Sequence, residues 1–364
     1  MSIIISKPGI KAIRVDKSRF AQEADLQKYI FENPEAIPLQ DIKPDVQIVI
    51  LERESPTSVG SIDVLGVDND GELYIIETKL YRNPDKRKVL AQVLDYGAAL
   101  WAKYGDPEAW ISELDRRLMD KSGVGLSEKL NIEFGDANDV REGMKESLSK
   151  GTFQFLILMD EVSTALKDLI LYLNENSSFT IFAVELEYYL FDDQQILIPH
   201  VYGAESRKKS ISGQTGQRRQ WDKTSFFIDA EKKMNEETLS AVHYVYEECR
   251  KITKENISWG TGKNDGSFSP KVDAISIRSL FSVYSDGRLS LNYYWLDDNE
   301  YSKTCREKLK EMLSAIEPFG HAIKNGVKKY PYFKSEIWLP HYKEFIQIIK
   351  EFVESSCISK ATEL

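Results

Sequence analysis

The stretch GSIDVLGVDNDGELYIIETKLY, residues 60–81, decides the fold of this chain. Two β-rich runs flank residues 69–71, which suit a three-residue hairpin loop with Gly71 in the left-handed conformation. With that loop, the register places Asp63 directly opposite Glu77, on one face of the hairpin. The sequence therefore predicts an antiparallel hairpin that carries two facing carboxylates.

The predicted face also holds an ammonium group and several apolar side chains. Lys79 lies two residues after Glu77 and shares its face, as do Leu65 and Ile75. A cross-strand salt bridge on a solvated face is the simple interpretation, but two carboxylates directly opposite each other repel. A divalent cation between the carboxylates would relieve that repulsion, and Mg²⁺ commonly takes one or two protein carboxylates.

The rest of the first two hundred residues predicts a mixed α/β domain, in which a sheet is flanked by helices. Ser18 is expected to cap the first helix, and the apolar run 153–160 is expected to be a strand buried on both faces. The expected elements are a helix over 17–32, a β-rich run over 45–54, the hairpin, a helix over 85–104, helical segments over 107–121 and 137–150, the strand 153–160, a helix ending near 173, and strands over 179–191 and 194–203.

A Ser-, Gly- and Gln-rich stretch separates this domain from a second pattern. Residues 205–223 hold six basic and two acidic residues, a net charge of +4, and are expected to form a basic flexible linker or a solvated loop. We therefore expect a first domain over 1–204, with a helical insertion at about 105–150, and a separate α+β domain over 224–364 that sets specificity or partner choice. In the latter, helices are expected over 235–254, 303–316 and 341–353, and strands over 274–285 and 288–296.

Composition narrows the class of protein. The chain has 364 residues and a net charge of −10, which disfavours unselective coating of nucleic acid. Its three cysteines are far apart, which indicates neither a disulfide framework nor a Cys-rich zinc site. No apolar run approaches the roughly 20 residues that span a bilayer. We expect a cytoplasmic protein with no membrane partner; the oligomeric state is left open.

Three polar residues lie on helices that should pack beside the hairpin. Glu23 lies three residues from each of two apolar positions of its helix, and Gln92 and Tyr96 are four apart, so they share one side of the next helix. A Glu at a helix margin is more often structural than functional. The three gain weight because both helices should cover the same sheet.

Together these residues resemble the PD-(D/E)XK nuclease superfamily, which has the restriction-endonuclease-like fold. Asp63 followed by Glu77-Thr78-Lys79 resembles its central motif, with Ile62 where the name of the superfamily has proline. Gln92 to Tyr96 is similar to the QxxxY element of the RecB-type branch, and Glu23 matches the acidic residue on the first core helix of many members. The resemblance covers roughly residues 15 to 200.

The resemblance implies a metal-dependent nuclease that hydrolyses phosphodiester bonds, with DNA the expected substrate and an endonuclease the expected type. The implied Mg²⁺ or Mn²⁺ ligands are Asp63, Glu77, the Thr78 carbonyl oxygen and Glu23. Lys79 would orient water or stabilise charge on the phosphate, and Gln92 and Tyr96 would position the site. The cations expected to meet nucleic acid are Arg82, Lys86, Arg87, Lys88, Arg207, Lys208, Lys209, Arg218 and Arg219.

Three alternatives stay open on the sequence. The first alternative is a non-catalytic nucleic-acid-binding or regulatory protein that keeps the nuclease fold. The second is an interaction protein whose two modules bind protein partners. A weaker alternative places chemistry at Glu185 and Glu187, which are two apart on an expected strand without a lysine nearby in the sequence.

Overall fold

The fold comes from a computed structural model, and the chain divides into two compact units. The first unit is Met1–Leu126 with Asn138–Thr215, and the second is Ser127–Ala137 with Gly216–Leu364. The residues described are 2–7, 9, 11–42, 46–82, 88–103, 105–134, 137–177, 179–203, 221–260, 265–296, 299–317, 319–324 and 331–362.

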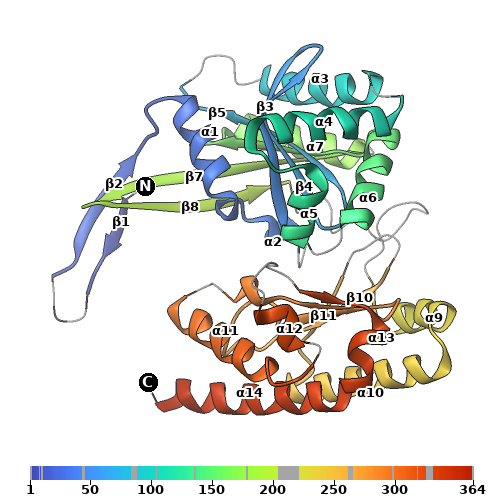
Figure 1. Cartoon of the computed structure of the whole chain (residues 1–364). Helices are drawn as coiled ribbons and strands as arrows, with labels where there is room; N and C mark the ends of the chain where they lie inside the picture. Colours follow the sequence, from blue (N-terminus) through green and yellow to red (C-terminus); the bar gives the residue numbers. More distant parts are fainter. Residues whose placement is uncertain are drawn as a thin grey trace. The chain divides into compact units, whose positions relative to one another are not determined.

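The first unit is built on a mixed eight-stranded sheet (Figure 1). Its strands are β1 (Ser2–Ile5), β2 (Ile13–Ser18), β3 (Ile48–Thr57), β4 (Gly60–Asp68), β5 (Leu73–Lys79), β6 (Gln154–Met159), β7 (Thr180–Phe191) and β8 (Gln194–Tyr202). They are ordered β1-β2-β7-β6-β5-β4-β3, with β8 paired to β7. β5, β6 and β7 run parallel, and every residue of β6 is buried, as its continuous apolar run predicts.

Helices cover both faces of this sheet, so the architecture is the predicted mixed α/β type. They are α1 (Glu23–Glu32), α2 (Leu39–Ile42), α3 (Lys88–Lys103), α4 (Pro107–Ser122), α6 (Ala137–Lys150), α7 (Thr164–Asn176) and the 3-10 helix η1 (Pro34–Ala36); α5 (Leu126–Phe134) lies between α4 and α6 in the chain. Leu26 of α1 packs in one core with Ile76 and Leu156. Gly97 of α3 packs against Phe155, which alternation places on the other face of β6.

The hairpin of β4 and β5 has the predicted register and loop. Val64 pairs with Ile76, and Val67 pairs with Leu73. Gly71 has a φ of +79°, the left-handed conformation that the three-residue loop requires. This local geometry carries Asp63 and Glu77 to the open end of the hairpin.

The start of the chain differs from the prediction. A helix was expected from Lys17 with Ser18 as its cap, but both residues belong to β2 and pair with Tyr189 and Tyr188 of β7. The helix begins at Glu23, after a turn in which the Gln22 amide donates to Asp25 Oδ2 at 3.0 Å. Strand pairing with a segment about 170 positions away in the sequence outweighed the local helical pattern. The β1 and β2 segments show too little alternation of apolar and polar residues to be predicted as strands.

The second unit has its own antiparallel five-stranded sheet, ordered β13-β12-β11-β10-β9. Its elements are α9 (Lys223–Lys233), α10 (Glu236–Ile252), β9 (Ile257–Trp259), β10 (Ser267–Pro270), β11 (Phe281–Tyr284), β12 (Leu289–Leu291), η2 (Tyr293–Trp295), α11 (Glu300–Leu313), α12 (Phe319–Lys324), β13 (Tyr332–Phe333), α13 (Ser335–Trp338), η3 (Leu339–His341) and α14 (Tyr342–Thr362). A separate core, with Phe226, Phe268 and Phe345 fully buried, lies within this unit.

Several predicted segments of the second half change their bounds. The strand expected over 288–296 is only β12, Leu289–Leu291, and the 3-10 helix η2 follows it because the Trp295 amide donates to the Asn292 carbonyl oxygen. The strand expected from residue 274 begins at Phe281, because the Ile275 and Ser276 amides both donate to Val272 O in a turn. Residues 205–220 of the predicted linker lie outside the described residues. Trp221 is buried and Asp222 caps α9, so the linker ends earlier than predicted. Among the described helices, none has the length and apolar composition to cross a membrane.

Candidate active site

Asp63 is held at the open end of the hairpin by the neighbouring strand. Its Oδ2 accepts hydrogen bonds from the Thr78 amide at 2.8 Å and from Thr78 Oγ1 at 2.7 Å. Burial raises the pKa of Asp63 even though both hydrogen bonds lower it. The carboxylate is therefore fixed in orientation but is an unfavourable place for an uncompensated charge.

Glu77 is the most deeply buried acidic group of the site, with 1% of its surface exposed. Its Oε1 lies 3.9 Å from Lys79 Nζ, and its Oε2 is buried without a hydrogen-bond partner. Burial and then the charge of Asp63 raise the pKa of Glu77 to about 8. A buried carboxylate oxygen without a partner is costly unless something else satisfies it.

The ammonium group of Lys79 joins two elements. Lys79 Nζ lies 3.3 Å from Glu23 Oε2, and Glu23 Oε1 accepts from the Leu80 amide at 3.4 Å. Because Glu23 is the first residue of α1, this contact sets the start of the helix against the end of β5. The structure thus brings the predicted acidic residue of the first helix to the predicted lysine.

The predicted pair on α3 also reaches this end of the sheet. Gln92 Nε2 donates to Tyr96 Oη at 2.8 Å. Burial raises the pKa of Tyr96, the hydrogen bond from Gln92 lowers it, and the charges of Glu77 and Asp63 raise it further. Tyr96 is therefore electrostatically coupled to both carboxylates.

Two residues that the sequence interpretation missed complete the surroundings. Gln27 of α1 is buried and donates to Glu54 Oε1 at 2.6 Å and to the Asp63 carbonyl oxygen at 3.2 Å. Gln27 could have been found, because it lies four residues after Glu23 on the same side of the helix. Glu54 could not, since its place depends on a bulge at Leu51 that shifts the register of β3 against β4.

The two carboxylates of this arrangement are groups that could hold a metal ion. Among the described residues, no group of three or more His, Cys, Asp or Glu side chains comes close enough to hold a metal by itself. Asp63 and Glu77 are a pair of adjacent carboxylates, and a hard cation that keeps several waters needs no more than such a pair. Glu23 is engaged with Lys79 in this structure.

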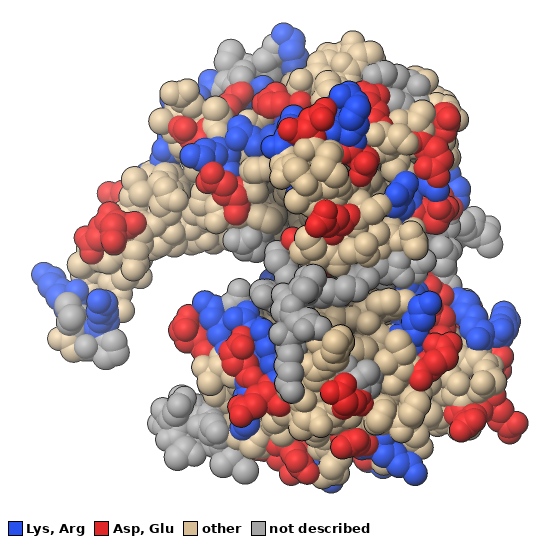
Figure 2. Space-filling model, in the orientation of Figure 1, with Lys and Arg blue, Asp and Glu red and all other residues tan. Residues whose placement is uncertain are grey.

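The predicted nucleic-acid contacts are only partly described. Arg82 is exposed and its Nη2 donates to the Ala21 carbonyl oxygen, and Lys88 is exposed at the start of α3. The other predicted cations lie outside the described residues: Lys86, Arg87, Arg207, Lys208, Lys209, Arg218 and Arg219. Basic and acidic side chains are interspersed over the face drawn in Figure 2.

The alternative site at Glu185 and Glu187 is a set of ion pairs. Lys17 Nζ lies 3.6 Å from Glu185 Oε1 and 3.2 Å from Glu187 Oε1. Lys167 Nζ lies 3.6 Å from Glu185 Oε2, and Tyr189 donates to Glu187 Oε2 at 3.0 Å. Both carboxylates are thus satisfied by their neighbours, which fits a structural role.

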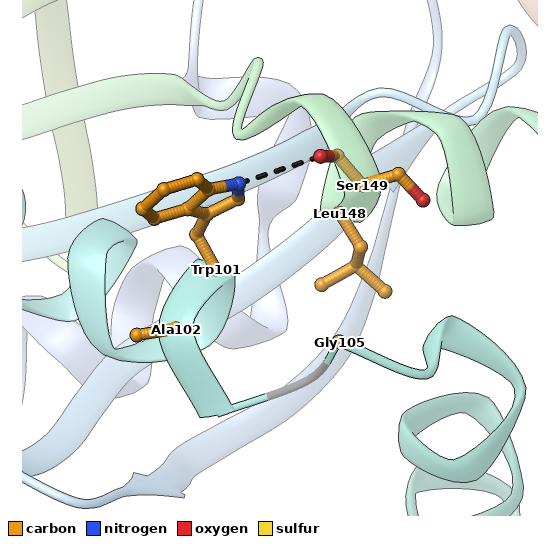
Figure 3. A pocket seen from close by; sticks show the side chains of 5 residues that line it. All are labelled: Trp101, Ala102, Gly105, Leu148 and Ser149. Carbon is orange, nitrogen blue, oxygen red and sulfur yellow. Dashed lines mark hydrogen bonds between the residues drawn. The ribbon is translucent and has the colours of Figure 1, made fainter.

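A cavity of about 450 Å³ lies beside the end of α3, and its described lining includes neither Asp63 nor Glu77 (Figure 3). Trp101, Ala102, Gly105, Leu148 and Ser149 line it, and the Trp101 indole donates to the Ser149 carbonyl oxygen at 3.3 Å. None of these five described residues has an ionisable side chain, so they supply none of the ionisable groups that acid–base or metal chemistry needs.

Comparison with known proteins points to nucleases. The chain is 33% identical over 134 residues to Endonuclease NucS of Pyrococcus furiosus, which covers 37% of this chain and 46% of that protein. It is 29% identical over 133 residues to Endonuclease NucS of Pyrococcus abyssi, covering 36% and 49%, and 33% identical over 108 residues to that of Thermococcus kodakarensis, covering 28% and 39%.

The chain thus spans about half, or less, of the length of these curated relatives. No family model matches the chain, and no solved structure matches it. The chain is therefore similar, over about a third of its length, to proteins named as endonucleases.

Proposed function

We propose that the chain is a metal-dependent endonuclease that hydrolyses phosphodiester bonds in DNA, on a PD-(D/E)XK, restriction-endonuclease-like core. The observation that carries the proposal is the buried, unpartnered Oε2 of Glu77 beside Asp63. Two carboxylates that repel one another, with one oxygen unsatisfied, form a site that is completed by a cation. Similarity to proteins named Endonuclease NucS supports the reaction class.

The residues present fit a divalent ion such as Mg²⁺ or Mn²⁺. Asp63 and Glu77 would hold it, with the Thr78 carbonyl oxygen as a further ligand and Glu23 joining directly or through water. When bound, such an ion polarises the scissile phosphate and lowers the pKa of a coordinated water.

The remaining side chains act around that pair. Lys79, fixed between Glu23 and Glu77, presents an ammonium group that can orient the attacking water or offset charge that develops on the phosphate. The hydroxyl of Tyr96, held by Gln92, is a donor at the same end of the sheet. Arg82 and Lys88, with the other predicted cations, are proposed to contact the phosphate backbone.

The decisive experiment measures cleavage of linear, circular, single-stranded and modified DNA with Mg²⁺, Mn²⁺ or a chelator. We expect metal-dependent cutting, with circular DNA among the substrates because the activity is endonucleolytic. Asp63→Asn and Lys79→Met should each lower the rate at least about 100-fold. Asp115→Asn is the matched control, since Asp115 also accepts a backbone amide, that of Leu126 at 2.7 Å, outside the site.

Two outcomes would contradict the proposal. Full activity of Lys79→Met on every substrate that the unmodified protein cuts would remove the lysine from the mechanism. Salt-sensitive DNA binding without Mg²⁺ or Mn²⁺ binding, measured by calorimetry, would instead favour a non-catalytic DNA-binding protein.

A further inference from the structure

Gln27 is a buried amide with all of its principal hydrogen-bonding groups engaged. Only 5% of the surface of Gln27 is exposed to solvent. Nε2 donates to Glu54 Oε1 at 2.6 Å and to the Asp63 carbonyl oxygen at 3.2 Å, while Oε1 accepts from Arg53 Nη2 at 2.8 Å. Two acceptors on one side and a guanidinium on the other leave a single orientation for the amide.

These contacts fall where the β-ladder is interrupted. Arg53 pairs with Val64 and Ser55 pairs with Ile62, so Glu54 is the residue opposite Asp63, yet that pair is missing from the ladder. Glu54 has a φ of +51°, a left-handed conformation that is strained for a residue other than glycine.

The ladder on the other side of Asp63 is also incomplete. The pairing of β4 with β5 ends at Val64 and Ile76, one position before Asp63 and Glu77. Beyond that point, Asp63 is tied to β5 by its side chain, through Thr78. The main chain of Asp63 therefore lacks a ladder pair toward either neighbouring strand.

We propose that Gln27 is a positioning residue: it takes the place of the missing ladder pair and fixes the Asp63 main chain and the Glu54 carboxylate. The inference rests on the proposed function, because Asp63 is a ligand of the proposed metal site. Aspartate has a short side chain, so a shift of its main chain moves the carboxylate by nearly the same amount. Gln27 thereby sets the distance between the Asp63 and Glu77 oxygens.

One helix then supplies both ends of the site. Glu23 and Gln27 lie one turn apart on α1; Glu23 meets Lys79, and Gln27 meets Asp63. Partners that orient metal ligands in this way typically contribute 10- to 100-fold in metal affinity. The class of ligand concerned is a hard divalent cation.

The test is calorimetric titration of the full chain with Mn²⁺, without DNA, using Gln27→Met, which keeps volume and removes the hydrogen bonds. We expect the Kd for Mn²⁺ to rise about tenfold or more. Gln154→Met is the matched control: Gln154 is also buried and donates to a carboxylate, Glu72 Oε2 at 3.0 Å, but lies at the other end of the parallel strands. Its Kd should stay within about twofold of the unmodified protein, even if its Tm falls.

Gln27→Asn is the second variant, because it keeps the amide but is one methylene shorter and cannot reach both acceptors. Its Kd should lie between those of the unmodified protein and Gln27→Met. If either Gln27 variant folds and binds Mn²⁺ as the unmodified protein does, Gln27 is not a positioning residue, while the proposed function stands. If the unmodified protein neither binds Mn²⁺ nor cuts DNA, the proposed function fails and this inference fails with it.

Discussion

At the scale of single residues, the buried carboxyl group of Glu77 lowers the stability of the folded protein at neutral pH. Glu77 carries a raised pKa of about 8 against an ordinary 4.5, because it is buried beside Asp63. Between pH 4.5 and about pH 8, the folded protein therefore holds a proton on Glu77, whereas the unfolded chain does not. The contribution of Glu77 to the free energy of unfolding is greatest below pH 4.5. It falls as the pH rises from 4.5 to about 8 and is lost above that.

Glu77→Gln should accordingly make the protein more stable and less active. In chelating buffer at pH 8 we expect the free energy of unfolding to rise by about 1–3 kcal/mol, since each pKa unit corresponds to about 1.4 kcal/mol. The gain should shrink toward pH 5, where the unmodified Glu77 is already protonated. Urea unfolding at the two pH values measures this; an equal effect at both would contradict the raised pKa.

At the scale of elements, the hairpin loop ties the site to the helical layer. Gly71 approaches α6 so closely that an added Cβ would lie 2.3 Å from the Val140 carbonyl oxygen and 2.6 Å from Gly143 Cα. This contact, together with the left-handed φ of Gly71, holds the loop that sets the register of Asp63 and Glu77.

Gly71→Ala should therefore cost more than backbone strain alone. Gly123→Ala is the matched control, because Gly123 has a similar φ of +71° with no atom within 4 Å of its added Cβ. We expect about 1–2 kcal/mol of destabilisation for Gly123→Ala and at least about twice that for Gly71→Ala. Urea denaturation of both variants decides it, and equal losses would mean that the loop can move away from α6.

At the scale of the whole molecule, two units each enclose a core of their own. Leu156 is fully buried in the first and Phe268 in the second. A chain with two cores need not unfold in one step.

Leu156→Ala and Phe268→Ala should each lower one thermal transition and leave the other in place. Removing either side chain costs about 2–5 kcal/mol, which for units of this size lowers a midpoint by roughly 5–15 °C. Scanning calorimetry of both variants measures the two midpoints. A common shift of both transitions by either substitution would show that the units unfold together.

The sequence by itself determined what short-range geometry controls. A three-residue loop with glycine sets the register between β4 and β5, so the proximity of Asp63, Glu77 and Lys79 was predictable without any distant contact. Helical spacing likewise brought Gln92 to Tyr96. In the first case a short hairpin loop joins the residues, and in the second a single turn of helix does. Both connections allow few backbone conformations.

Only the tertiary structure decided what depends on strands from distant parts of the chain. The β2 strand forms because β7 offers an edge to Lys17 and Ser18, which overrides their local helical pattern. Glu54 faces Asp63 only because Leu51 is an extra residue in β3, and Gln27 meets Asp63 only once α1 lies across β4. Each of these contacts is made after long loops of chain have closed, and the free energy that selects it comes from burial and pairing summed over the whole sheet.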